Sequence, residues 1–97
     1  MKQLSLFIST DLERRAVDAI ERAGVDGYLR LAGATGNKFE PEDQHSRTMT
    51  WEALVLIIPG ADDAQVASIV GELEEHANSC ATRPCLRMVV ASVEAVY

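Results

Sequence analysis

Apolar and polar residues alternate over residues 2–9, which predicts a β-strand with one buried face. The residues of that face are Leu4, Leu6 and Ile8. Over residues 12–23 the apolar positions recur every three or four residues, which predicts an amphipathic helix. We expect Thr10 and Glu13 to form a capping box at its start, and Gly24 to end it.

Three further segments have the composition of strands. They run from about residue 27 to 32, from 49 to 58, where Pro59-Gly60 should end the strand, and from 86 to about 97. A second helix should lie between the last two, begun by Asp62 and Gln65 as a capping box. Its apolar stripe comprises Val66, Ile69, Val70, Leu73 and Ala77.

The predicted order is β-α-β-β-α-β, which is typical of the ferredoxin-like α+β arrangement. We expect one domain over residues 1–97, with a four-stranded antiparallel sheet and two helices on one face. Residues 53–58 and 88–91 are apolar at every position, as in strands buried on both faces. Two helices cover only one face, so we expect a homo-oligomer whose sheets face one another. The alternative is that a loop or the C-terminal tail folds over that face.

The net charge of −6 excludes the basic surface that nucleic-acid partners and anionic membranes require. No apolar run is long enough to cross a membrane, so we expect no membrane insertion. The first strand pattern begins at Lys2 with no signal peptide before it, and this favours a cytoplasmic protein. The sequence also lacks the common hydrolase, metalloprotease and P-loop motifs, so we do not expect an enzyme.

The connection over residues 33–50 is much longer than the two to five residues of a simple hairpin. Gly33, Gly36 and Lys38 are candidates for a phosphate-binding turn, with a solvated loop as the alternative. The mixed charges of this stretch suggest a loop that orders on binding a partner protein. The candidate partner-contacting residues are Asn37, His45 and Arg47.

Two other groups of residues have side chains that could bind a ligand or react. Arg83 and Arg87 flank the start of the last strand and are candidate phosphate ligands, or else ordinary surface arginines. His76, Cys80 and Cys85 are candidates for a metal site, joined by His45, or for a redox disulfide. Their spacing matches no common zinc pattern, and we favour unrelated side chains.

Several segments resemble PII-type nitrogen-regulatory proteins. They are the turn Gly24-Val-Asp-Gly-Tyr28, the loop start Gly33-Ala-Thr-Gly36, the run Thr48-Met-Thr-Trp51 before an apolar strand, and the ending Leu86-Arg-Met-Val-Val-Ala-Ser-Val-Glu94. The resemblance covers nearly the whole chain and is closest to a small PII-like subgroup with a short T-loop.

The resemblance implies a homotrimeric signalling protein that binds adenine nucleotides in clefts between subunits. It also implies that residues 33–50 form a T-loop that docks on an enzyme or a transporter. Two features depart from the family: the loop contains no tyrosine, and residues 78–87 lack the glycines of the family's nucleotide loop. The candidate effector is an adenine nucleotide, and the two departures leave AMP, ADP or a simple anion as alternatives to ATP. The alternative function is a metal- or redox-responsive module that uses His76, Cys80 and Cys85.

Overall fold

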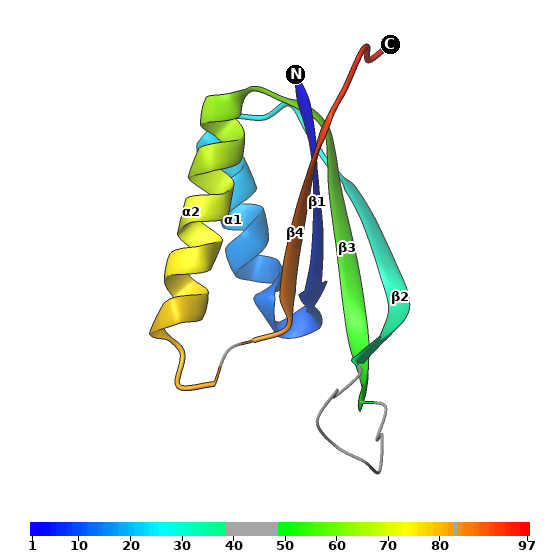
Figure 1. Ribbon diagram of the computed structural model, residues 1–97, viewed down its shortest axis with the longest axis vertical. Coiled ribbons are helices and arrows are strands. Elements are labelled where there is room, and N and C mark those ends of the chain that lie inside the picture. The colour runs from blue at the N-terminus through cyan, green and yellow to red at the C-terminus, as the bar shows by residue number, and fades with distance from the viewer. Residues whose placement is uncertain (39–48, 83) are drawn as a thin grey trace.

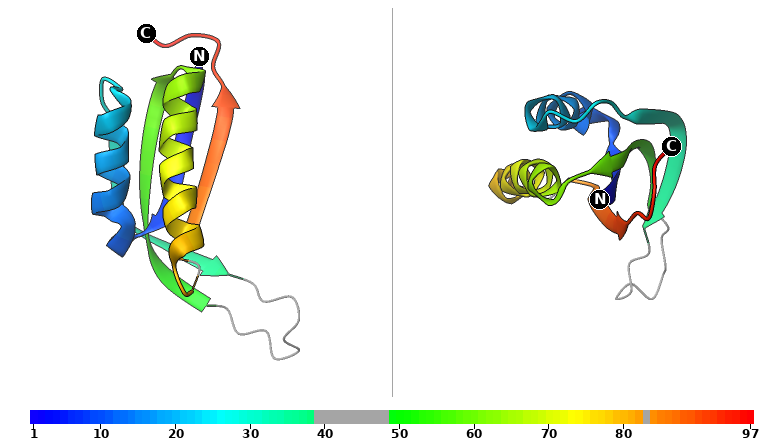
Figure 2. Two further views of the ribbon diagram at one scale, coloured as in Figure 1. Left: turned by 90° about the vertical axis from the view of Figure 1, so that its left-hand side faces the viewer. Right: turned by 90° about the horizontal axis from the view of Figure 1, so that it is seen from above.

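The chain folds as a four-stranded antiparallel sheet with two helices packed on one face (Figures 1 and 2). The computed structural model describes residues 1–38, 49–82 and 84–97. Its elements are β1 (Lys2–Ser9), a 3₁₀ turn (Thr10–Leu12), α1 (Glu13–Ala23), β2 (Leu29–Lys38), β3 (Met49–Ala61), α2 (Asp63–Ser79) and β4 (Leu86–Ser92). The strand order is β2-β3-β1-β4. The ferredoxin-like βαββαβ prediction is therefore confirmed.

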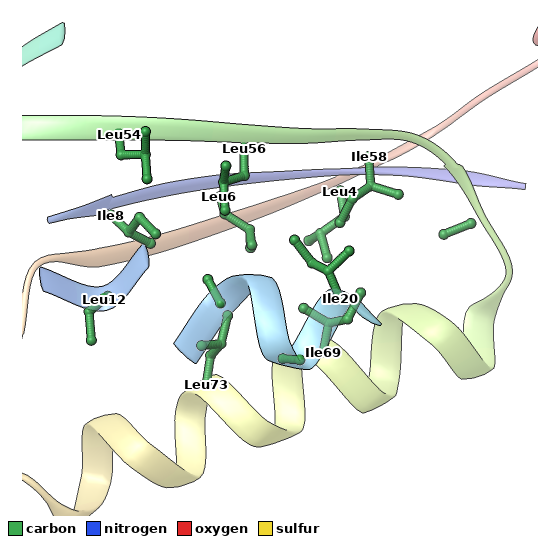
Figure 3. Packing of buried hydrophobic residues seen from close by; sticks show 13 residues of the cluster. Leu4, Leu6, Ile8, Leu12, Ile20, Leu54, Leu56, Ile58, Ile69 and Leu73 are labelled. Atoms are coloured by element: carbon green, nitrogen blue, oxygen red, sulfur yellow. The ribbon is translucent and has the colours of Figure 1, made fainter. Parts of the chain in front are cut away.

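The hydrophobic core lies between the helices and the sheet face that they cover (Figure 3). Alternate residues of β1 and β3 point into it, and both helices contribute one apolar stripe. Its largest fully buried side chains are Leu4, Leu6, Ile8, Ile20, Leu54, Leu56, Ile58, Ile69 and Leu73. In the described part of the chain no polar or charged residue is buried, so the interior of this layer is held together by apolar packing.

The helix ends follow local chemistry, with one correction. Asp62 Oδ1 accepts from the Gln65 N–H at 2.7 Å, and Gln65 Oε1 accepts from the Asp62 N–H at 3.0 Å, so the predicted capping box is confirmed. Gly24 ends α1 in the left-handed conformation. The capping box at Thr10 is wrong, because Thr10 lies in a 3₁₀ turn and no side chain caps this end. The Glu13 carboxylate binds an arginine of β2 instead.

Three strand boundaries differ from the prediction. β2 runs from Leu29 to Lys38, past Ala32, because backbone pairing with β3 does not need apolar side chains. β3 continues through Pro59-Gly60 to Ala61, because an extra residue there shifts the register against β1 and accommodates the missing proline N–H. β4 ends at Ser92 rather than near residue 97, because Ser92 already pairs with Lys2, the first residue of β1.

The chain beyond β4 crosses the end of the sheet beside the N-terminus (Figure 1). The Val93 N–H donates to the Met1 carbonyl at 3.1 Å. A side chain at Gly60 would meet Met1 Sδ and Val96 Cγ2, so the tail contacts β3 there. The tail leaves most of the sheet uncovered, because Leu29, Leu31 and Val89 stay about half exposed. The alternative that the C-terminal tail covers this face is therefore wrong, and most of the connection over residues 33–50 lies outside the described residues.

The sheet face without helices is largely apolar, and we call it the helix-free face. The register places two rows of residues across it. One row is Leu31, Val55, Phe7 and Arg87, and the other is Leu29, Ile57, Ser5 and Val89. Phe7, Leu29, Leu31 and Val89 are 38–59% exposed. The expected second apolar face therefore exists, and it is open in the single chain.

The capping box at α2 gives a direct test of this fold. Replacing Asp62 with alanine removes the acceptor for the Gln65 N–H and should lower the free energy of unfolding by about 1 kcal/mol. Asp63→Ala removes the same charge one residue later without removing a cap bond. It should therefore lower the free energy of unfolding by less than Asp62→Ala does. Urea unfolding of both variants measures the difference. Equal losses would mean that the cap bond contributes nothing beyond charge.

Candidate functional site

Gly33 lies at a bulge in β2 and not in the predicted phosphate-binding turn. Leu31 pairs with Val55 and Ala34 with Ala53, so β2 has one extra residue between these pairs. Gly33 takes a φ of +79°, which suits a glycine at a β-bulge. Beyond it, Gly36 and Lys38 pair with Trp51 and Met49 in a regular ladder. Their position in a strand corrects the expected turn.

The segment beyond the bulge forms an arm that projects away from the helices (Figure 2). Its base is held by Arg30, three residues before Gly33, which forms a bidentate ion pair with Glu13 at the start of α1. The Arg30 Nη2–Glu13 Oε1 distance is 3.0 Å. This hydrogen bond lowers the pKa of Glu13 and raises that of Arg30. The pair therefore joins the edge strand to the helix layer where the arm begins.

Two of the three predicted partner-contacting residues cannot be placed. Asn37 lies in β2 opposite Thr50, near the end of the arm. His45 and Arg47 lie outside the described residues.

Arg87 lies in β4 directly opposite Phe7, and it therefore belongs to the helix-free face. It is the only charged residue in the two rows defined above. It also borders a groove of about 420 Å³ between α2 and β4. The other residues of this groove are Val70, Glu74, Leu86, Met88 and Val90. Arg83 lies outside the described residues.

The two halves of the predicted phosphate site are far apart within one chain. Gly33 lies on β2 and Arg87 on β4, and these strands form opposite edges of the sheet. Three strand spacings separate them, which is roughly 14 Å. One phosphate group cannot reach both positions in a single chain. A site that uses both therefore requires a second copy of the chain.

The third predicted group consists of His76, Cys80 and Cys85, and the structure brings only part of it together. Cys80 Sγ lies 3.6 Å from His76 Nε2, as their spacing along one helix face suggested. Both cysteines are free, half-buried thiols. Among residues 1–38, 49–82 and 84–97, no three His, Cys, Asp or Glu side chains are grouped so that they could hold a metal ion. The metal alternative therefore has no support in this part of the chain, and His45 lies outside it.

Comparison with solved structures establishes the fold. CPII of Thiomonas intermedia K12, described as a nitrogen regulatory PII-like protein bound to ADP, AMP and bicarbonate, has a TM-score of 0.73 and 18% identity, over 99% of this chain and 92% of CPII. The GlnK–ATP complex of B. subtilis has a TM-score of 0.75 and 9% identity, over 95% of this chain and 80% of GlnK. This chain has the fold of PII-like proteins.

The PII-like resemblance seen in the sequence is thus confirmed for the fold. No protein-family model matches the sequence, and no curated protein matches it. The resemblance implied a T-loop between β2 and β3, and residues 39–48 of this connection lie outside the described residues. No helix in the described residues is long and apolar enough to cross a membrane.

Sequence reasoning missed two ion pairs, one between Arg22 of α1 and Glu72 of α2 and the other between Glu13 and Arg30 near the arm. Glu13 and Arg30 are seventeen positions apart and belong to a helix and a strand. The capping-box pattern suggested that Glu13 interacts only with its own helix. Its distant partner, Arg30, becomes apparent only in the fold, which brings β2 to the start of α1. The sequence did contain one signal of this ion pair. Arg30 lies on the helix side of an edge strand, and a charged side chain in that position needs a partner.

The ion pair predicts how stability changes with pH. Its hydrogen bond to Arg30 holds the pKa of Glu13 below the ordinary 4.5, so the stabilisation is present above that pH. It should disappear as the pH falls through the lowered pKa. The difference in unfolding free energy between the parent and Glu13→Gln should therefore be constant near neutral pH and shrink below about pH 4.5.

The matched control is Glu21→Gln on the same helix, since the Glu21 carboxylate makes no ion pair in the described structure. Urea unfolding across pH 3 to 7, as a rough working range, measures both variants. A difference for Glu13→Gln that is the same at all pH values would contradict the assigned ion pair.

Proposed function

We propose that this chain is a PII-like regulatory protein of the cytoplasm and not an enzyme. It binds a small effector, with an adenine nucleotide as the first candidate, in clefts between the subunits of a homotrimer. The segment over residues 33–50 then contacts a partner protein, either an enzyme or a transporter. The observation that carries this proposal is the PII-like fold over nearly the whole chain.

The helix-free face supports the assembly. It exposes Phe7, Leu29, Leu31 and Val89, which belong to three different strands and form one apolar surface. Surfaces of this kind on small proteins mark association sites. The tail leaves this surface open, so a second copy of the same face is the natural cover. The resemblance implies closed three-fold symmetry, in which the helix-free face of every copy is covered in the same way.

Arg87 supports an anionic effector. A guanidinium enclosed in an apolar interface is costly unless an anion neutralises it. The two rows of the helix-free face contain no carboxylate, and the acidic residue that borders the same groove as Arg87 is Glu74 of α2. A phosphate group between subunits would supply the charge. The proposed ligands are Gly33, Gly36 and Lys38 of one subunit, with Arg83 and Arg87 of the next.

The solved neighbours guide the choice of ligands. CPII was solved with ADP, AMP and bicarbonate, and GlnK with ATP. We therefore propose adenine nucleotides, with and without bicarbonate, as the first compounds to test here. Binding at the base of the arm would favour one of two states of residues 33–50, and the partner would select between them. Asn37, His45 and Arg47 are the proposed partner contacts.

The assembly is tested by placing a charge on the helix-free face. Leu31→Glu adds a carboxylate to an edge strand where the parent side chain is half exposed, so the single chain should still fold. It should convert the trimer to monomers, because each interface would bury an unpaired charge. Light scattering during gel filtration measures the mass. Arg14→Glu on α1 is the control and should remain trimeric.

The effector site is tested by calorimetric titration with ATP, ADP and AMP. Arg87→Gln should weaken nucleotide binding by about tenfold or more, because it removes a charged hydrogen-bond donor. Arg14→Gln, an exposed arginine on α1, should bind like the parent. A trimer that gives no heat with any nucleotide would overturn the nucleotide proposal and leave the assembly intact. A parent protein that stays monomeric would overturn both.

A further inference from the structure

The connection between α2 and β4 contains both cysteines of the chain. Cys80 is the residue at which α2 ends, and Cys85 immediately precedes β4. Both are free thiols and half-buried, so small reagents can reach them. The chain has only two cysteines, and a disulfide within one chain can therefore join only this pair.

Cys80 lies beside the imidazole ring of His76. Its Sγ lies 3.6 Å from His76 Nε2 and 3.3 Å from the His76 carbonyl oxygen. The i, i+4 spacing at the end of α2 produces both contacts. An imidazole beside a thiol can take its proton, and the resulting thiolate is the reactive form of cysteine. If only the contact with the His76 carbonyl mattered, Cys80 would simply cap the end of α2. The experiment must therefore distinguish this capping role from reactivity of the thiol.

Cys85 is held at a fixed place in the sheet. Its carbonyl accepts from the Ser9 N–H at 3.0 Å, which anchors it at the end of β1. The Cys80 N–H is likewise bonded to the Ala77 carbonyl, at 3.4 Å. Four residues separate the two cysteines in the sequence, and a disulfide between them needs a Cα separation of about 5.5–6 Å. Each thiol therefore has its own anchor, with a short connection between them.

We propose that Cys80 is a site of reversible oxidation by peroxides, with His76 as its proton acceptor and Cys85 as the resolving thiol. In the first step the Cys80 thiolate attacks a peroxide oxygen. The O–O bond breaks, Cys80 becomes a sulfenic acid, and the released hydroxide leaves as water with the proton from His76. In the second step the Cys85 thiolate attacks the Cys80 sulfur. The S–S bond forms, the S–O bond breaks, and a second water leaves with the Cys85 proton.

Oxidation would join the end of α2 to the start of β4. These two elements form the groove that Arg87 borders, and Arg87 lies two residues after Cys85. The disulfide would therefore constrain the strand segment that carries Arg87. The thiol proposal itself does not depend on effector binding, since it rests on contacts within one chain.

The first test treats the reduced full-length protein with hydrogen peroxide and measures its intact mass. Each chain should lose the mass of two hydrogen atoms, dithiothreitol should restore them, and peptide mapping should link Cys80 to Cys85. The Cys85→Ser variant should instead trap dimedone on Cys80, because the sulfenic acid has no resolving thiol. No mass loss, or disulfides formed only between chains, would overturn the proposal.

The second test separates reactivity from helix capping. In the Cys85→Ser background, His76→Gln should slow alkylation of Cys80 by iodoacetamide several-fold. His45→Gln changes the only other histidine and should leave the rate unchanged. Cys80→Ser keeps a donor for the His76 carbonyl, so its thermal stability should match that of the parent. An alkylation rate that does not depend on His76 would show that the contact is structural only.

Discussion

The main constraint on this molecule is a sheet that is apolar on both faces in a chain with helices for only one. The core between helices and sheet is complete, and residues such as Leu6 and Leu56 are fully buried in it. The opposite face presents Phe7, Leu29 and Leu31 to water, which is unfavourable for an isolated domain. The proposed association of several copies would remove this exposure, and it would also let residues on opposite sheet edges serve one site.

The arm of β2 and β3 depends on the same sheet. The bulge at Gly33 inserts an extra residue into an edge strand, and pairing then resumes out to Lys38. Just before the bulge, Arg30 ties β2 to the start of α1. A strand that is tied to the helix layer and then projects from it suits a segment that must present residues to a partner. The proposed partner-contacting segment therefore begins at a strand that is joined to α1.

Much of this could be predicted from local patterns. Strand alternation, helical spacing and the Asp62–Gln65 capping box identified the elements, and their order identified the fold. Non-local features could not be predicted. The role of Glu13 depends on a strand seventeen residues away, and the strand at Gly36 is set by backbone pairing, which has no side-chain signature. The sequence also suggested one phosphate site, whereas the strand order separates Gly33 from Arg87 within the chain.

The central claim is that effector sites form only between copies of this chain. Native mass spectrometry of the protein titrated with ADP tests it most directly, because it reports assembly and bound ligand together. The account predicts a trimer that takes up as many as three nucleotides, with none on any monomer that dissociates. ADP bound to a monomer, or a chain that stays monomeric at all protein concentrations, would contradict it.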